Sequence, residues 1–307
     1  MRSKSILVTG ASGLLGANLV MEWLSRGWAP IALYAQHAVS FATPSRALDL
    51  CDAERTAELV QAYKPGWIVH SAAATNVDWC EEHPAECRRL NVDASRNLAE
   101  AAKVVGARFV YISTDAVFDG GAGNYSESDE PCPLNVYAES KLLAEHAVAE
   151  VLPESVIVRT NIYGWNLQEK LSLAEWMLKR FETGSRFPGF EDVVFSPILV
   201  NDLADCLAEM MTLDFQGLFH VVGSESCNKF AFAEHLAATF GQDRGLVERS
   251  QIQCAHLRAV RPRNTSLQTM KLQQAVGHGT PGIREGLERF KSLRTNGFSA
   301  HLKAASL

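Results

Sequence analysis

Short apolar segments alternate with segments of helical periodicity along the first half of the chain. Residues 5–8 form an apolar run that ends in Thr9-Gly10, and residues 14–24 carry apolar side chains at the three- and four-residue spacing of a helix. The same alternation predicts strands at 30–34, 67–71, 108–113 and 155–159, and helices at 53–63, 85–105 and 137–150. Pro84 suits the first turn of the longest helix, and Gly106 suits its C-terminal cap.

The predicted strands are apolar almost throughout, which is typical of a parallel sheet covered by helices on both faces. We therefore expect an α/β fold whose first domain spans residues 1–160. Beyond this boundary the alternation loosens, and helices are predicted only at 171–181 and 229–240. We find no internal repeat, low-complexity tract or flexible linker. Residues 161–307 are expected to form mainly a smaller α/β lobe, with parts that return to the first domain and a cleft between the two.

The turn after the first strand has the sequence Gly10-Ala11-Ser12-Gly13-Leu14-Leu15-Gly16, a G-x-x-G-x-x-G pattern. Glycines in such a turn let the backbone approach a pyrophosphate, which then lies at the N-terminus of the following helix. A tight turn that needs glycine for its own sake is the alternative reading. The position between a first strand and a first helix favours dinucleotide binding.

Tyr137 and Lys141 are four positions apart in the helix predicted at 137–150, so their side chains lie on the same face. Such a pair is common on solvated helix surfaces. The strand at 108–113 is followed by Thr114, and in a parallel sheet its carboxyl end lies at the same edge as the glycine-rich turn. We therefore expect Thr114, Tyr137 and Lys141 to converge on one crevice.

These three side chains have the chemistry needed to reduce a carbonyl group with a nicotinamide cofactor. Tyr137 would donate a proton to the carbonyl oxygen, and Thr114 would bind the same oxygen. The ammonium of Lys141 is expected to lower the pKa of the Tyr137 phenol by favouring the phenolate.

Composition limits the classes of partner. The 307 residues are 47% hydrophobic and 21% charged, the formal net charge is -6, and Lys and Arg form no cluster, so nucleic acid is not expected as a partner. The apolar run at 6–8 is too short for a secretory signal, and no run reaches the 18 or so apolar residues of a membrane span, so we expect a cytoplasmic protein and no membrane partner.

The seven cysteines are scattered, which indicates reduced thiols. The segment 78–83 carries acidic, Cys and His donors without the spacing of known metal sites, so no metal is expected.

The motifs together resemble the extended short-chain dehydrogenase/reductase family. The resemblance rests on the glycine-rich turn, Ser71-Ala72-Ala73-Ala74-Thr75, Thr114 and the Y-x-x-x-K of Tyr137 and Lys141. Four further segments are similar to dTDP-4-dehydrorhamnose reductases and to their relative, the regulatory beta subunit of methionine adenosyltransferase: STDAVFDG at 113–120, PLNVYAESKLLAE at 133–145, VRT at 158–160 and RPRNTSL at 261–267. The resemblance covers nearly the whole chain.

This resemblance implies a Rossmann-type doubly wound parallel sheet with a smaller substrate-binding lobe. It also implies reduction of the 4-keto group of a nucleotide-linked 6-deoxyhexose by NADPH or NADH. By motif position the catalytic residues are Thr114, Tyr137 and Lys141. The cofactor-binding residues are Gly10, Ser12, Gly13, Leu14, Leu15, Gly16, Asp49, Leu50, Ala72, Ala73, Ala74 and Asn91, together with Tyr137 and Lys141. The residues expected near the substrate are Asp115, Phe118, Asn161, Arg261 and Arg263.

Arg261 and Arg263 are expected to bind the diphosphate of a nucleotide-linked sugar, because one guanidinium group can donate two parallel hydrogen bonds to phosphate oxygens. Surface charge is the alternative. The chain departs from the reductase pattern at Asn161-Ile162-Tyr163-Gly164, where the pattern places a tryptophan, and in a longer loop at 36–48. The strand at 30–34 is followed by Ala35-Gln36-His37, which contains no acid to repel the 2′-phosphate of NADP. NADPH should therefore be accepted, with NAD as the second possibility.

Two alternatives to the reductase remain open at this point. A non-catalytic regulatory subunit would keep cofactor binding and act by docking on another enzyme. A nucleotide-sugar epimerase of the same superfamily would need an additional acid-base group, which the sequence does not identify. A homodimer is a further possible assembly.

Overall fold

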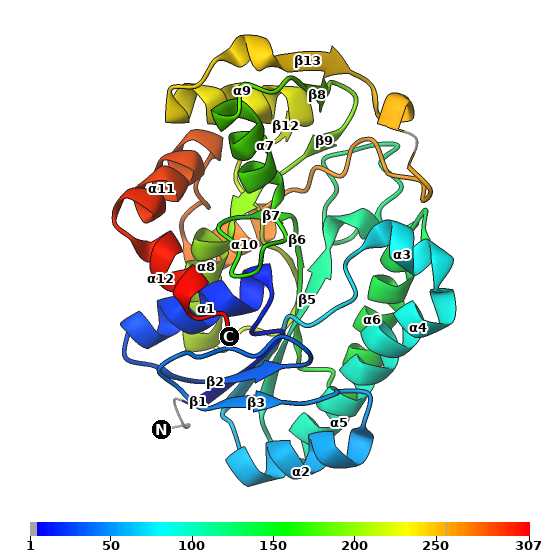
Figure 1. Cartoon of the computed structure of the whole chain (residues 1–307). Helices are drawn as coiled ribbons and strands as arrows, with labels where there is room; N and C mark the ends of the chain where they lie inside the picture. Colours follow the sequence, from blue (N-terminus) through cyan, green and yellow to red (C-terminus); the bar gives the residue numbers. More distant parts are fainter. Residues whose placement is uncertain (1–4, 256) are drawn as a thin grey trace.

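Seven parallel strands form the central sheet of the computed structural model, which describes residues 5–255 and 257–307 (Figure 1). In space the strands follow the order β11-β6-β5-β4-β1-β2-β3. Their bounds are Ser5–Thr9 (β1), Ala29–Tyr34 (β2), Ser45–Ala47 (β3), Trp67–His70 (β4), Arg108–Thr114 (β5), Val156–Thr160 (β6) and Gly217–His220 (β11). The prediction of an α/β fold built on a doubly wound parallel sheet is confirmed.

Side chains that alternate along each strand enter two separate cores. Ile6 and Val8 of β1 pack in one core with Trp23, whereas Leu7 between them packs in the other with Leu98. The first core is covered by α1 (Leu14–Ser25) and α8 (Val200–Thr212). The second is covered by α2 (Ala53–Tyr63), α5 (Ala94–Val105) and α6 (Val136–Val151), which pack side by side (Figure 1). Both faces are buried, which explains why the strands are apolar throughout.

The long helix predicted at 85–105 is present but is divided by a wider turn. It consists of α4 (Pro84–Arg88), a π-helical turn at Arg89–Asp93, and α5. Pro84 is its first residue, and Gly106 ends it with a φ of 69° and an N–H directed at the carbonyls of Ala102 and Lys103. No feature of the sequence predicts this π-helical turn, which holds one residue more than an α-helical turn and occurs often at functional sites.

The second half of the chain builds a smaller α/β lobe and also returns to the central sheet. The lobe contains α7 (Leu173–Glu182), α9 (Lys229–Phe240) and α11 (Ile283–Thr295). Its short strands pair as β7 (Ile162–Tyr163) with β10 (Ile198–Leu199), β9 (Val194–Phe195) with β12 (Cys227–Asn228), and β8 (Phe187–Phe190) with β13 (Val247–Ser250). Strand β11 and helix α8 return to the sheet beside β6 and α1. The boundary at residue 160 stays a prediction.

The remaining helices are short. They are α3 (Val77–Glu82), α10 (Met270–Val276) and α12 (Phe298–Ala304). Within the described residues, no helix combines the length and apolar character needed to cross a bilayer.

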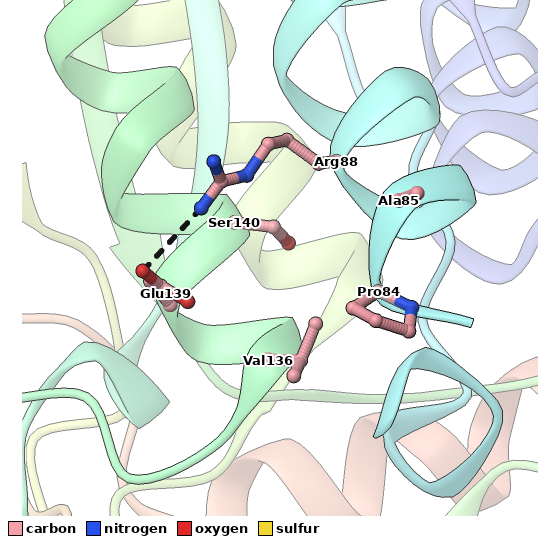
Figure 2. Close-up of a pocket in the computed structure, with 6 residues that line it drawn as sticks. All are labelled: Pro84, Ala85, Arg88, Val136, Glu139 and Ser140. Atoms are coloured by element: carbon pink, nitrogen blue, oxygen red, sulfur yellow. Dashed lines mark ion pairs between the residues drawn. The ribbon is translucent and has the colours of Figure 1, made fainter. Parts of the chain in front are cut away.

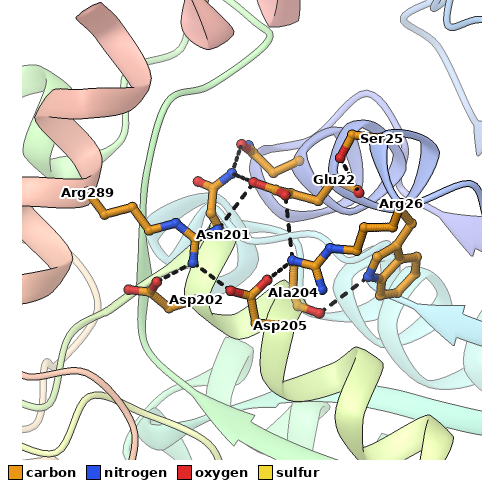
Figure 3. Close-up of polar contacts among 10 residues, drawn as sticks. Glu22, Ser25, Arg26, Asn201, Asp202, Ala204, Asp205 and Arg289 are labelled. Carbon is orange, nitrogen blue, oxygen red and sulfur yellow. Dashed lines mark hydrogen bonds and ion pairs between the residues drawn. The ribbon is translucent and has the colours of Figure 1, made fainter. Parts of the chain in front are cut away.

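A cluster of charged side chains joins the lobe to the first domain (Figure 3). Arg289 of α11 has Nη1 at 2.6 Å from Asp202 and 2.7 Å from Asp205, and Nη2 at 3.5 Å from Glu22 of α1. Arg26 contacts Asp205 and lies 3.7 Å from Glu22. The side chain of Asp202 is only 4% exposed, so its charge depends on Arg289 for compensation. This cluster fixes α11 and α8 against the helix that follows the glycine-rich turn.

We predict that Arg289→Ala lowers the free energy of unfolding by roughly 2 to 4 kcal/mol, because removing one partner of a buried ion pair leaves the other charge uncompensated. Urea unfolding measures this change. Arg294→Ala in the same helix is the matched control, since Arg294 and its partner Glu182 are 46% and 41% exposed, and an exposed pair contributes about 0 to 1 kcal/mol. Equal losses in the two variants would contradict the assignment.

Candidate active site

The glycine-rich turn lies at the point where the chain order of the sheet reverses, between β1 and β4. Gly10 has a φ of 66°, and a Cβ on it would lie 2.9 Å from the Cα of Ala72 at the end of β4. A Cβ on Gly16 would lie 2.2 Å from the carbonyl oxygen of Gly10, so these two positions exclude a side chain. The turn leads into the N-terminus of α1, which attracts phosphate groups. The residues present therefore fit a dinucleotide.

Asn91 lies in the π-helical turn and connects the cofactor side of the crevice to helix α6. Its Oδ1 accepts a hydrogen bond from the N–H of Ala74 at 2.7 Å. Its Nδ2 donates to the carbonyl of Ala74 at 3.2 Å and to Oγ of Ser140 at 2.8 Å. Asn91 is 1% exposed. The amide thus holds the 72–74 loop and the helix of Tyr137 in a fixed relation, and its direct contact with a cofactor stays a prediction.

A second set of buried polar contacts joins the end of β1, directly before the glycine-rich turn, to β4 and α5. Oγ1 of Thr9 lies 2.7 Å from Nδ1 of His70, and Nε2 of His70 lies 2.9 Å from Oγ of Ser95. Ser95 in turn donates to the carbonyl of Asn91 at 2.6 Å. Burial lowers the pKa of His70 to about 3, so the ring stays neutral. His70 is not among the residues predicted from the sequence, although it is a polar residue at the end of an apolar strand, a pattern that could have identified it.

Thr114 and Tyr137 lie close together, and Lys141 follows Tyr137 by one turn of α6. Thr114 ends β5 and Tyr137 lies in the first turn of α6, where the Thr114 hydroxyl is near enough to lower the pKa of the phenol. Lys141 is 3% exposed; its Nζ donates to the carbonyl of Ile112 at 2.7 Å and lies 4.2 Å from the ring centroid of Tyr111. The ammonium is thus directed at β5.

The expected lowering of the Tyr137 pKa by Lys141 is wrong for this structure. Burial of the phenol is the dominant effect and raises the pKa of Tyr137, because the phenolate loses its hydration. Burial also lowers the pKa of Lys141 to about 7, and the nearby Glu145 carboxylate opposes that change. Tyr137 is therefore protonated at neutral pH.

Asp115 and Asn161 were both expected near the substrate, and the structure places their side chains in contact with each other. Nδ2 of Asn161 donates to the carboxylate of Asp115 at 2.8 Å. Thr265 donates to the same oxygen, and Thr114 donates to the other oxygen at 3.2 Å. Asp115 is 3% exposed, and burial raises the pKa of its carboxyl group. Both carboxylate oxygens thus accept hydrogen bonds from protein donors. The bond to Thr114 holds the threonine hydroxyl in place.

Phe118 was expected near the substrate, and this prediction is wrong. The side chain is fully buried in a small core and stacks on Tyr125, with ring centroids 4.1 Å apart. His220 contacts it edge-on at 5.8 Å, and the guanidinium of Arg159 lies 5.1 Å from its centroid. Packing behind the strand ends removes Phe118 from the crevice.

The two arginines of the 261–267 segment have different surroundings. Arg261 pairs with Asp78 of α3 at 3.0 Å and is 22% exposed, whereas Arg263 is 64% exposed and lies 4.0 Å from Asp192. The segment forms bridges to both parts of the molecule, through Asn264 to Val194 and through Leu267 to Tyr125. It therefore lies at the junction of the lobe and the first domain, and a phosphate contact stays a prediction.

Asp49 and Leu50 follow the edge strand β3. The Asp49 carboxylate is exposed and accepts from the N–H of Cys51 at 3.0 Å, while the Leu50 carbonyl accepts from Asn97 at 3.0 Å.

Trp165, which follows the segment where the reductase pattern places its tryptophan, is 7% exposed and stacks on Phe290 in the core. It does not replace the missing tryptophan at the crevice.

A hollow of about 330 Å³ lies between α4 and the first turns of α6 (Figure 2). Its lining residues are Pro84, Ala85, Arg88, Val136, Glu139 and Ser140. An ion pair of 3.5 Å joins Arg88 to Glu139 across it. The hollow includes none of the sequence-predicted site residues, so we place the candidate site at the carboxyl ends of the parallel strands, the edge that carries the glycine-rich turn after β1 and Thr114 at the end of β5.

Known proteins match almost the full length of the chain. The model of the family described as RmlD substrate binding domain matches residues 4–294. The probable low-salt glycan biosynthesis reductase Agl14 of Haloferax volcanii is 31% identical over 284 residues, covering 91% of this chain and 95% of that protein. Methionine adenosyltransferase 2 subunit beta of Bos taurus is 32% identical over 308 residues, covering 94% and 88%. The structure of dTDP-4-dehydrorhamnose reductase from Bacillus anthracis in complex with NADP has a TM-score of 0.85 at 28% identity, covering 94% and 99%.

The buried histidines make stability depend on pH. Burial lowers the pKa of both His70 and His220 to about 3, whereas an unfolded histidine titrates near 6.5. As the pH falls from about 6.5 toward 3, the unfolded chain binds protons that the folded chain cannot bind, so the free energy of unfolding decreases, by about 1.4 kcal/mol per pH unit for each group. This contribution is fully present above pH 6.5.

We therefore predict that His220→Leu makes stability fall less steeply on acidification. Urea unfolding between pH 7 and pH 4.5 measures the slope for this variant and for the parent. His301→Leu is the control, because His301 is exposed on α12. A slope that is the same in all three proteins would show that His220 does not contribute.

Proposed function

Because the chain belongs to the RmlD substrate binding domain family, we propose that it is an NADPH-dependent reductase of the 4-keto group of a nucleotide-linked 6-deoxyhexose. The observation that supports the proposal is the approach of Thr114 to Tyr137 at the sheet edge that also carries a glycine-rich turn fitted to a dinucleotide. The fold and family resemblance noted in the sequence agree with these matches.

The cofactor would be held along the edge of the sheet. Gly10, Ser12, Gly13, Leu14, Leu15 and Gly16 would contact the pyrophosphate, and Ala72, Ala73 and Ala74 would line the opposite side of the crevice. Asp49 and Leu50 would lie near the adenine. A solved relative contains NADP, and the nicotinamide of such a cofactor supplies the hydride when bound.

Tyr137 would deliver the proton to the carbonyl oxygen of the sugar. A general acid must be protonated before the reaction, and burial keeps the phenol in that form at neutral pH. Lys141 lies one helical turn further along α6, and its proposed contribution is to stabilise the phenolate that forms as Tyr137 gives up its proton, against the stronger opposing effect of burial. Thr114 would orient the phenol, because Asp115 holds the threonine hydroxyl.

The substrate would enter between the strand ends and the lobe. Arg261, partly exposed beside Asp78, is the better candidate for the diphosphate, since Arg263 projects into solvent. Asn161 would reach the sugar, and Asp115 would act through Thr114 and Asn161.

A non-catalytic subunit is the second candidate function. Methionine adenosyltransferase 2 subunit beta, which is named as part of another enzyme, matches 94% of the chain. The two functions differ in a single measurement, because only a reductase oxidises NADPH in the presence of a nucleotide-linked 4-keto sugar.

We predict that Tyr137→Phe lowers turnover by about 10²- to 10⁴-fold, the range typical of a lost general acid, while NADPH binding changes little. NADPH oxidation is measured with a panel of nucleotide-linked 4-keto sugars that includes dTDP-4-dehydrorhamnose. Tyr63→Phe, at the end of α2 and away from the crevice, is the control. Undiminished turnover in Tyr137→Phe would overturn the mechanism, and no oxidation by the parent with any sugar would favour the subunit.

We also predict that NADPH is accepted, with an affinity less than tenfold below that for NADH, because no acid follows β2 to repel the 2′-phosphate. Ala35→Asp would place a carboxylate there and should weaken NADPH by about tenfold or more relative to NADH. Fluorescence titration of both nucleotides measures the ratio. A parent that binds NADPH ten times more weakly than NADH contradicts the prediction.

A further inference from the structure

A buried ion pair lies directly behind the candidate catalytic residues. Nη2 of Arg159 is 2.7 Å from Oε2 of Glu145, and Nε is 3.0 Å from Oε1. Both side chains are 4% exposed. Ser113 also donates a hydrogen bond to Oε1 of Glu145. The carboxylate is therefore fixed by hydrogen bonds from two side chains on two neighbouring strands.

The position of this pair relates it to the site. Tyr137, Lys141 and Glu145 follow one another at intervals of four along α6, so they lie on one face of the helix. Ser113 immediately precedes Thr114 on β5, and Arg159 is its partner in the neighbouring strand β6. The ion pair thus touches the helix and the strand that carry the proposed catalytic groups.

Stability alone is a weak reason for such a pair. Removing two charges from water costs several kcal/mol for each ion, and apolar side chains of similar volume often serve as well. The pair also sits one helical turn from Lys141, a lysine that is itself buried.

Among the described residues, one carboxylate acts on Lys141. Its own helix contributes Glu145, with Tyr137 one turn before Lys141; β5 contributes the Tyr111 ring and the carbonyl of Ile112, β4 the neutral His70, and α4 the thiol of Cys87. The Arg159 guanidinium lies beyond Glu145 as its partner. Within the described chain, Glu145 is therefore the negative charge that offsets the cost of burying the Lys141 ammonium.

We propose that Glu145, fixed by Arg159 and Ser113, is a positioning residue that keeps Lys141 charged so that Lys141 can assist proton transfer from Tyr137. The inference rests on the proposed reductase function for its catalytic meaning. The ionisation of Lys141 itself is measurable without any substrate.

The first experiment is a carbon-13 NMR titration of the lysine ε-carbons in the full chain. The Lys141 resonance is identified by its loss in Lys141→Arg. The parent should titrate near pH 7, and Glu145→Gln should lower the midpoint by at least about one unit. Glu150→Gln is the matched control, because Glu150 lies in the same helix but is 70% exposed, and it should leave the midpoint unchanged.

Glu145→Gln leaves the Arg159 guanidinium buried without its partner, and this variant could fold poorly for that reason. A second variant therefore tests the inference without an unpaired buried charge. Glu145→Gln combined with Arg159→Met removes both charges. Its Lys141 midpoint should fall between those of the parent and Glu145→Gln, because the nearer carboxylate has the larger effect.

The second experiment compares kcat/KM for dTDP-4-dehydrorhamnose, or for the first panel sugar reduced, across pH. The ratio of parent to Glu145→Gln should be about tenfold at pH 8, where fewer Lys141 side chains stay protonated, and below about twofold at pH 5.5. A merely structural defect would lower activity equally at both pH values.

An unchanged Lys141 midpoint in both Glu145 variants, or a ratio that does not vary with pH, overturns the inference. A lowered midpoint together with no reduction of any sugar by the parent keeps the role of Glu145 toward Lys141 and rejects the proposed reaction instead. The two failures are thus distinguishable.

Discussion

The continuous set of hydrogen bonds from Thr9 to Ser140 determines how the two sides of the crevice meet. It starts below the glycine-rich turn, passes through His70, Ser95 and Asn91, and ends on the helix that carries Tyr137. Every member is buried, so each bond is protected from competition with water. The glycine-rich turn and helix α6 are therefore held in one fixed relation, which the proposed proton transfer from Tyr137 would require.

Burial has opposite consequences at different points of this arrangement. It keeps His70 neutral, where a charge would break the contacts below the turn, and it keeps the phenol of Tyr137 protonated. The same low polarity disfavours the ammonium of Lys141, and the Glu145 carboxylate opposes this effect. The site thus combines a histidine and a phenol that burial keeps neutral with a lysine whose charge burial disfavours.

Residues that are close in sequence at the end of β5 make different contacts. Thr114 reaches Tyr137, Asp115 turns back to bind Thr114, Asn161 and Thr265, and Phe118 enters a core behind the sheet. The 3-10 turn at Asp115–Val117 follows β5 directly and redirects the chain. A motif therefore locates the region of a site but does not tell which of its members face the ligand.

The sequence by itself determined the α/β fold, the order of the main strands and helices, the glycine-rich turn and the proximity of Thr114 to Tyr137. These features follow from local periodicity and from the rule that parallel strand ends share one edge. Only the tertiary structure decided that Asn91 is committed to Ala74 and Ser140, that Phe118 is buried, and that the pKa of Tyr137 is raised. Burial and hydrogen-bond partners depend on segments distant in the chain, as Thr265 and Asp115 illustrate, and no local pattern specifies such a contact.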